Sequence, residues 1–177
     1  MSLAIQLPAR GDQTAFNLRI WEQTLADPAL SGLEQRIETD RHGHIIMTPP
    51  PGPAHGSRQF SIGFELRTRL GGRVITECPL TTSDGVKAID VGWFSDTRHA
   101  RAYDARCFLE APEICVEVIS PSNTRAEMDE KKALYFDAGA SEVWFCDEDG
   151  SMTFFTAAGG TAASSTLCPG FPLDFPA

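Results

Sequence analysis

The chain has 177 residues and a formal net charge of −9, and these two values already limit its class. A chain of this length is most simply one domain with a substantial hydrophobic core. Its charge has the wrong sign for a protein that coats duplex DNA by releasing counterions, although a local basic rim could still contact nucleic acid. No apolar run is long enough to span a bilayer, so we expect no membrane-embedded segment.

Two further features predict a cytoplasmic protein. Residues Met1–Pro8 lack the basic start and apolar core of a secretory signal. The 5 cysteines are scattered and form no Cys-x-x-Cys pair, which favours reduced thiols over a disulfide scaffold or a structural zinc site. We expect one domain over residues 1–177, with 1–32 as an N-terminal helical extension and 157–177 as a C-terminal tail.

The first predicted elements are a helix and a hairpin. Thr14–Leu25 has the apolar period of an amphipathic helix, with Asp12 or Thr14 as its cap. Two strands joined by the turn Asp40–Gly43 follow, at Leu33–Thr39 and His44–Thr48.

A proline-rich segment, Pro49–Pro53, separates the hairpin from the next helix, because neither a helix nor a central strand accommodates it. The helix is predicted over Ala54–Leu70 and ends at Gly71-Gly72. Two strands then follow, at Arg73–Pro79 and Val86–Phe94.

The second half alternates strand and helix. Residues 96–106 are polar and receive no assignment, and Ile114–Ile119 is a buried strand closed by Ser-Pro. Thr124-Arg125-Ala126-Glu127 has the spacing of a capping box, so a helix is predicted from there to Ala138, with Gly139 as its stop. The remaining strands are Glu142–Cys146, Met152–Thr156 and an edge strand before Pro176. The class is therefore α/β or α+β, with one mixed sheet.

Two carboxylates interrupt apolar strands. Glu117 lies within Ile114–Ile119, and Asp90 lies within Val86–Phe94. Burying an ionised carboxylate is costly unless it is paired or binds a metal ion. Both residues are therefore candidate site residues.

Two further residues complete the candidate site. At 100° per residue, Lys131 falls near the middle of the apolar stripe formed by Leu134, Ala138 and Tyr135, so its ammonium needs an anionic partner. Glu38 closes a strand just before the hairpin turn. Carboxylates and a lysine that converge on one sheet indicate a site for a divalent cation. Structural salt bridges, such as one between Lys131 and Glu117, are the alternative.

Other polar residues carry weaker signals. Arginines form two basic runs, one including Arg58 and the other Arg98, and solvated surface is the favoured interpretation of both. His55 could contact phosphate or support Glu38, but a surface or capping histidine is favoured. His55 and Arg58 are retained as candidate substrate-binding residues. Tyr135 and Trp144 are interpreted as core aromatics, and 147–150 as an exposed turn.

Several segments of the chain together form a recognisable pattern: Arg36-Ile37-Glu38, Gly43-His44-Ile45-Ile46-Met47-Thr48-Pro49, His55-Gly56, Ile89-Asp90-Val91 with Trp93, Glu117-Val118-Ile119-Ser120-Pro121-Ser122, Glu130-Lys131 with Tyr135, Ala138-Gly139, and Glu142-Val143-Trp144 with Asp147. In these segments the chain resembles the Uma2 family, formerly DUF820. The resemblance extends over about Leu33 to Thr156 and is most specific from Glu117 to Trp144.

This resemblance implies the PD-(D/E)xK restriction-endonuclease-like fold, a mixed sheet flanked by helices, with a phosphodiesterase site that uses Mg²⁺ or Mn²⁺. It implies that Asp90 and Glu117 bind the metal, that Glu38 is a helper acid and that Lys131 is the helix-borne lysine. The chain departs from the common motif at two positions: Ile89 replaces the proline before Asp90, and Ile119 replaces the lysine two residues after Glu117.

Three functions follow as hypotheses. The first is an Mg²⁺-dependent DNA endonuclease, in which Lys131 positions the attacking water. The second is a catalytically inactive binding or scaffold protein with the same fold, which the acidic net charge favours. The third is hydrolysis of another phosphate ester. A homodimer, formed through the N-terminal helix or the final edge strand, is expected by analogy with endonucleases that cut two strands.

Overall fold

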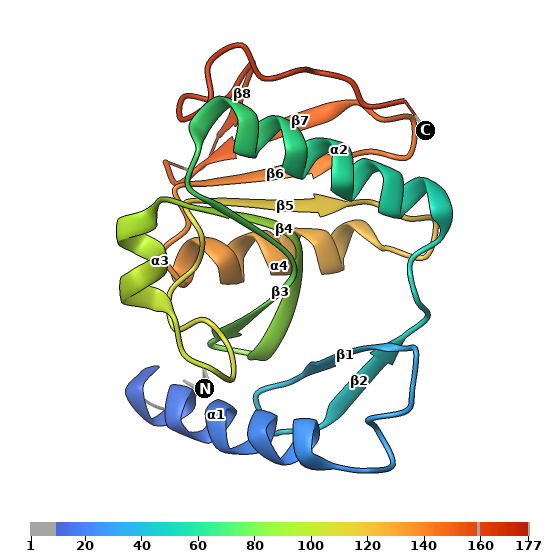
Figure 1. The fold of residues 1–177 in the computed structure, drawn as a ribbon, viewed down its shortest axis with the longest axis vertical. Coiled ribbons are helices and arrows are strands. Elements are labelled where there is room, and N and C mark those ends of the chain that lie inside the picture. Colours follow the sequence, from blue (N-terminus) through green and yellow to red (C-terminus); the bar gives the residue numbers. More distant parts are fainter. Residues whose placement is uncertain (1–9, 159, 177) are drawn as a thin grey trace, which may run out of the picture.

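The computed structural model describes residues 10–158 and 160–176, so residues 1–8, where we predict no secretory signal, lie outside it (Figure 1). Within the described residues, the chain order of elements is α1 (Arg10–Ala26), β1 (Arg36–Thr39), β2 (Ile45–Thr48), α2 (Pro53–Leu70), β3 (Arg73–Thr82), β4 (Gly85–Phe94), α3 (Asp96–Ala102), β5 (Ile114–Val118), α4 (Arg125–Asp137), β6 (Glu142–Cys146), β7 (Met152–Thr156) and β8 (Thr161–Ala162).

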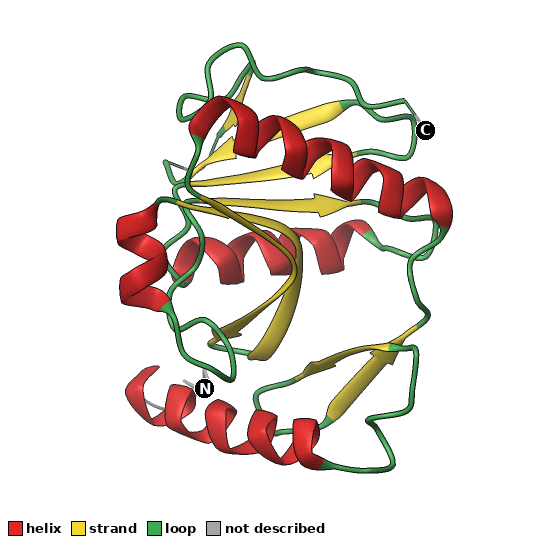
Figure 2. Ribbon diagram, viewed as in Figure 1, coloured by secondary structure: helices red, strands yellow, loops and turns green. Residues whose placement is uncertain are grey.

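A six-stranded mixed sheet forms the centre of the molecule, in the order β3-β4-β5-β6-β7-β8 (Figure 2). Only the β5–β6 pair is parallel, because α4 connects these two strands as a crossover. The predicted mixed α/β class is confirmed. The hairpin β1–β2 forms a second, two-stranded sheet, which the expectation of a single sheet missed.

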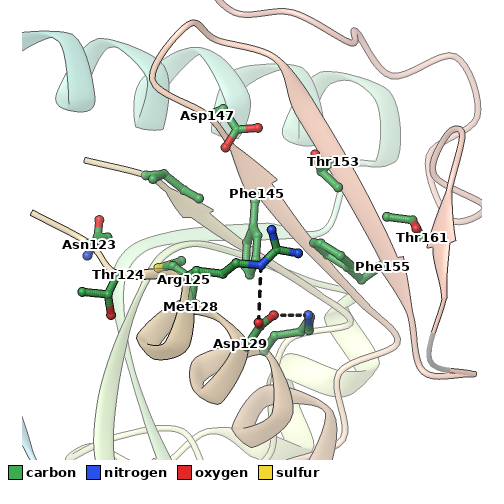
Figure 3. Close-up of a pocket in the computed structure, with 12 residues that line it drawn as sticks. Asn123, Thr124, Arg125, Met128, Asp129, Phe145, Asp147, Thr153, Phe155 and Thr161 are labelled. Carbon is green, nitrogen blue, oxygen red and sulfur yellow. Dashed lines mark hydrogen bonds and ion pairs between the residues drawn. The ribbon is translucent and has the colours of Figure 1, made fainter. Parts of the chain in front are cut away.

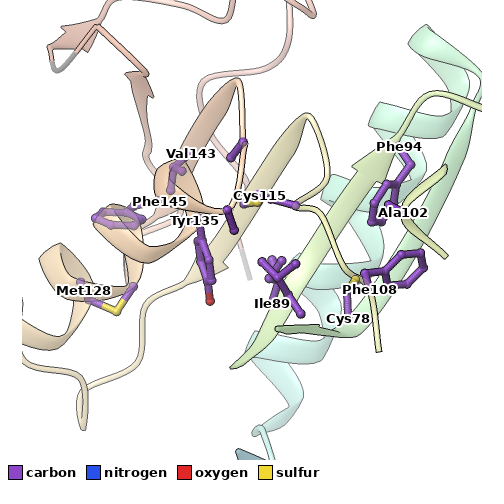
Figure 4. Packing of buried hydrophobic residues seen from close by; sticks show 14 residues of the cluster. Cys78, Ile89, Phe94, Ala102, Phe108, Cys115, Met128, Tyr135, Val143 and Phe145 are labelled. Carbon is purple, nitrogen blue, oxygen red and sulfur yellow. The ribbon is translucent and has the colours of Figure 1, made fainter. Parts of the chain in front are cut away.

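Two helices cover opposite faces of the sheet. Ile62 and Leu66 of α2 pack in one cluster with Val116 of β5, and Met128 and Tyr135 of α4 pack in another with Cys115 (Figure 4). This separation follows from the strand period of two, which sends Val116 and Cys115 to opposite faces. Strand β5 is thus buried on both faces, as its apolar sequence, interrupted only by Glu117, predicts.

Helix α4 begins as predicted. The Thr124 hydroxyl accepts a hydrogen bond from the Glu127 backbone N–H at 3.2 Å, and the Glu127 carboxylate accepts one from the Thr124 backbone N–H at 2.8 Å. Gly139, at φ 102°, follows the last turn, where a left-handed residue ends a helix. The capping box therefore fixes the phase of the helix that carries Lys131.

Three helices and several strand ends differ from the prediction. Helix α1 extends back to Arg10, so Asp12 and Thr14 lie inside it and do not cap it. Its packed face is largely polar, with Gln13 donating to Asn17, and apolar periodicity therefore could not locate its start. Helix α2 includes Pro53, which is tolerated at the first helical position. The unassigned segment 96–106 contains α3.

The cysteine and hydropathy predictions agree with the described residues. All 5 cysteines are free and buried. Among the helices described for 10–158 and 160–176, none has the length and apolar character needed to cross a membrane.

Candidate active site

A cavity of about 560 Å³ lies between the hairpin, the first turn of α2, the end of β5 and the first half of α4. Helices α2 and α4 cover opposite faces of the sheet, but both start near the C-terminal end of β5 (Figure 1). The structure brings together five of the predicted site residues in the lining of this cavity: Glu38, His55, Asp90, Glu117 and Lys131.

Asp90 is almost completely buried and makes four contacts. Its Oδ2 accepts a hydrogen bond from the Val118 backbone N–H at 2.7 Å, which ties β4 to the end of β5. Its Oδ1 lies 2.7 Å from Arg36 Nη1, 3.4 Å from His55 Nε2 and 3.5 Å from Gln59 Nε2. Burial acts to raise the pKa of Asp90, but the contact with His55 and the charge of Arg36 outweigh it and lower this pKa. Asp90 is thus held as a carboxylate.

Glu117 is in a different electrostatic environment. Its Oε1 accepts a hydrogen bond from the Tyr135 hydroxyl at 2.6 Å, and its Oε2 accepts one from Lys131 Nζ at 3.2 Å. Burial raises the pKa of Glu117 to about 7; the charge of Lys131 opposes this rise, and the charge of Asp90 adds to it. Two carboxylates of one cavity therefore hold protons with different affinities, as is common at functional sites.

Lys131 connects Glu117 to the hairpin. Its Nζ lies 3.1 Å from Glu38 Oε1, and its side chain is only 18% exposed. Burial acts to lower the pKa of Lys131, but Glu117 and Glu38 outweigh it and raise this pKa, so the amine stays charged. The inward direction predicted from helical periodicity is confirmed, and so is the ion pair with Glu117 that was the alternative to a metal site.

The sequence analysis did not identify Arg36 as a functional residue. The Arg36 guanidinium reaches the cavity from β1, where it pairs with Asp90 and with Glu77 Oε2 at 3.0 Å, and it also donates to the Ala88 carbonyl. Burial acts to lower the pKa of Arg36, but four nearby acids outweigh it and raise this pKa. Arg36 and Glu38 lie two residues apart on one strand, a spacing that places both on one face and that could have indicated their shared role.

Glu77 is the second residue that the sequence analysis missed. It has φ 48°, and no other described residue apart from glycine has a positive φ. The β3–β4 pairing skips it, between Thr76 and Cys78. Its carboxylate accepts a hydrogen bond from Gln59 Nε2 at 2.6 Å, in addition to pairing with Arg36. Backbone strain of this kind tends to persist where the surrounding structure requires it.

The charges of the cavity favour a cation. Four carboxylates act on Arg36, namely Glu38, Glu77, Asp90 and Glu117. The permanent cations of the lining that pair with them are Arg36 and Lys131, because the third, Lys87, pairs with Asp84. If all four are ionised, two negative charges remain, which one divalent ion would neutralise.

His55 supplies a further donor. Its Nε2 is buried and has no hydrogen-bond partner of good geometry among the described residues. Ligand atoms of His55, Glu77 and Asp90 lie within 4.8 Å of one another. Oxygen donors suit Mg²⁺ and Mn²⁺, and imidazole accompanies carboxylates at transition-metal sites. The residues present therefore fit a divalent cation. The interpretation of His55 as a surface or capping residue was wrong, since its side chain is only 15% exposed.

Arg58 lies apart from this cavity. Its guanidinium is buried and donates to the backbone carbonyls of Phe175 at 3.0 Å and Glu148 at 2.8 Å. The interpretation of Arg58 as solvated surface was therefore wrong. Arg98, in the other basic run, makes ion pairs with Glu110 and Glu113.

Comparisons with known proteins agree with the fold. A family model, Uma2, described as "Putative restriction endonuclease", matches residues 21–169. The chain is also similar to a crystal structure from Anabaena variabilis ATCC 29413, described as "a putative nuclease belonging to DUF820", with a TM-score of 0.65 and 18% identity over 78% of this chain and 86% of that one. No curated protein gives a significant match.

Proposed function

The chain belongs to the Uma2 family, and from this membership together with the geometry of the cavity we propose that it is a divalent-metal-dependent endonuclease that hydrolyses DNA phosphodiester bonds. The observation that carries the proposal is the excess of carboxylates over cations around Asp90, beside the buried His55 Nε2, which has no hydrogen-bond partner of good geometry in the described part of the chain.

Asp90 and Glu117 would hold Mg²⁺ or Mn²⁺, with His55 as a neighbouring donor that faces Asp90. A bound divalent ion supplies a water of lowered pKa and offsets negative charge on a phosphodiester. The contacts of the two acids support this assignment: a backbone N–H orients Asp90, and the Tyr135 hydroxyl orients Glu117. Pre-orientation of this kind reduces the cost of reorganising a ligand when an ion binds.

Lys131 would position the attacking water, and Glu38 would hold Lys131 in place. The 3.1 Å contact between Lys131 and Glu38 supports both roles, because it fixes a charged ammonium at the mouth of the same cavity. An ammonium there would also stabilise charge that develops on the phosphate. This arrangement requires only that the lysine side chain reach the cavity, so a lysine on α4 serves although Ile119 stands two residues after Glu117.

The decisive experiment is cleavage of plasmid and linear DNA by the Asp90→Asn protein in Mg²⁺ and Mn²⁺. Asparagine keeps the shape of Asp90 but removes its charge, and we expect cleavage to fall by more than about a hundred-fold. The matched control is Asp104→Asn, which removes an acid that pairs with Arg106 outside the cavity. Unchanged cleavage in Asp90→Asn would reject the assignment.

A second candidate function is a catalytically inactive binding protein, and one observation favours it. The acids of the cavity already have partners within the chain, since Arg36 neutralises Asp90 and Lys131 neutralises Glu117. If this network is purely structural, purified protein will cleave none of a panel of DNA, RNA and nucleotide substrates. The same panel tests the third hypothesis, hydrolysis of another phosphate ester.

A further inference from the structure

A second cavity, of about 480 Å³, lies on the other side of the first turns of α4, between that helix and strands β6, β7 and β8 (Figure 3). We propose that this cavity binds one unpaired nucleobase of the nucleic-acid strand whose phosphates enter the candidate active site. In naming a substrate strand the inference rests on the proposed function, but base binding itself requires no hydrolysis.

The two cavities are adjacent. Asn123 and Met128 line both of them, and the segment Asn123–Met128 forms the ridge between them. A strand that crosses this ridge would therefore pass directly from one cavity to the other. Ligand sites of small molecules fall in the same volume range, roughly 300–1,000 Å³.

Aromatic rings form the inner wall. Phe145 and Phe155 lie with their ring centroids 4.9 Å apart and their planes at 62°. Their side chains extend from β6 and β7 into the cavity (Figure 3). Nucleobases stack on aromatic side chains irrespective of sequence, because every base has a π face.

One cation lies over the Phe155 ring, and a second extends from the ridge. Lys132 Nζ is 4.4 Å from the centroid of Phe155, and Arg125 extends from the ridge with its side chain 96% exposed. Both interact with Asp129, so the rim has charge of both signs. A ring for the base next to a cation for the phosphate is the combination that single-strand-binding proteins use.

Polar groups at the far wall suit the edge of a base. Asp147, Thr153 and Thr161 line the cavity opposite α4 (Figure 3). A carboxylate can accept a hydrogen bond from an exocyclic amino group, and hydroxyls can donate or accept. A base within a duplex has both faces covered by its neighbours, so only an unpaired or extruded base can enter. We therefore expect a preference for strands with an unpaired nucleotide near the scissile phosphate.

The test is binding of a single-stranded DNA of about ten nucleotides that carries a fluorescent adenine analogue at a central position. EDTA is present, so that neither metal nor cleavage contributes. Wild type should bind the strand and quench the analogue by stacking. Phe155→Ala should weaken binding by roughly 5- to 150-fold and remove the quenching. Phe155→Leu keeps apolar bulk in the sheet and should also lose the quenching, so a folding defect in the alanine variant cannot decide the result.

The matched control is Phe64→Ala. Phe64 is 59% exposed on α2 and stacks on Phe60, outside the lining of both cavities. The Phe64→Ala substitution should leave binding of the strand and quenching of the analogue unchanged.

Wild type that binds no strand, or Phe155 variants that bind and quench like wild type, would overturn the inference. So would an equal loss in Phe64→Ala. Phe155-dependent binding by a protein that cleaves nothing would support the base site and reject the nuclease proposal. Cleavage by a protein that shows no Phe155-dependent binding would support the nuclease proposal and reject the base site.

Discussion

At the scale of single residues, Arg36 is the most informative side chain of the cavity. It is 16% exposed and pairs with Asp90 and Glu77. Without Arg36, the buried Asp90 carboxylate would lack this cation, and Glu77 nearby would repel it. Arg36 therefore has the role of an internal counter-cation, and it would compete with a metal ion that binds Asp90 as proposed.

Replacing Arg36 with methionine tests this role. The metal-free Arg36→Met protein should lose about 3–5 kcal/mol of unfolding free energy, because the buried Asp90 carboxylate is left without its cationic partner. Mn²⁺ should restore part of this loss, since a cation would again neutralise Asp90. Urea unfolding with and without Mn²⁺ measures both effects. Arg101→Met is the control: Arg101 is 60% exposed and pairs with Glu110, so its loss should change the unfolding free energy far less than Arg36→Met does.

Glu117 predicts a dependence of stability on pH. Its pKa is raised from an ordinary value of 4.5 to about 7 in the folded protein. Between these two values the unfolded chain has released the proton that the folded chain still holds, so the unfolding free energy falls as the pH rises. The contribution is on the order of 3 kcal/mol across the window.

The comparison that isolates this effect is metal-free wild type against Glu117→Gln, since glutamine stays neutral at every pH. Urea unfolding at several pH values from about 4 to 8 should show wild type losing stability relative to the variant as the pH rises. Parallel profiles for the two proteins would show that Glu117 titrates normally.

At the scale of elements, the hairpin β1–β2 supplies Arg36 and Glu38, so its position on the sheet decides whether the site is complete. Close packing at Gly85, the first residue of β4, fixes that position. The Thr39 hydroxyl accepts a hydrogen bond from the Val86 backbone N–H at 2.9 Å. A Cβ atom at Gly85 would lie 2.3 Å from the Thr39 carbonyl oxygen, and its φ of +85° already favours glycine.

Gly85→Ala should therefore displace the hairpin. We expect a loss of about 1–3 kcal/mol of unfolding free energy. We also expect tighter Mn²⁺ binding by calorimetry, because Arg36, the competing cation, would move away from Asp90. Gly32→Ala is the matched control, since a Cβ atom there would meet no atom within 4 Å. Equal stability and Mn²⁺ affinity in the two variants would show that this contact does not position the hairpin.

At the scale of the whole molecule, metal binding should appear as global stability. A ligand that binds only the folded state raises the unfolding free energy by about 2.7 kcal/mol at a concentration of 100 times its Kd. Thermal unfolding of wild type should therefore shift upward as Mg²⁺ or Mn²⁺ is added, and Asp90→Asn should shift much less. A wild-type unfolding temperature that does not change with either ion would favour the scaffold function, because a cation does not stabilise a salt-bridge network whose charges are already paired.

Local sequence patterns predicted the parts of the fold that depend on neighbouring residues. The capping box of α4 located its start, and helical periodicity placed Lys131 on the inward face. Acids within apolar strands identified Asp90 and Glu117, because burial of a carboxylate requires a partner wherever the strand lies. The start of α1 was not predictable in this way, since its inward face is polar: Asn17 donates to Thr81 and to the Thr82 carbonyl.

The sequence by itself determined which residues need partners: two buried acids and one inward lysine have charges that an apolar interior does not tolerate alone. Only the tertiary structure decided which residues those partners are. Arg36 and Asp90 are 54 residues apart, and docking of the hairpin brings them together. The direction of α2 turns His55 toward Asp90 and Arg58 toward the Phe175 carbonyl. These pairings depend on how elements pack over long chain separations, and no short-range period in the sequence encodes that packing.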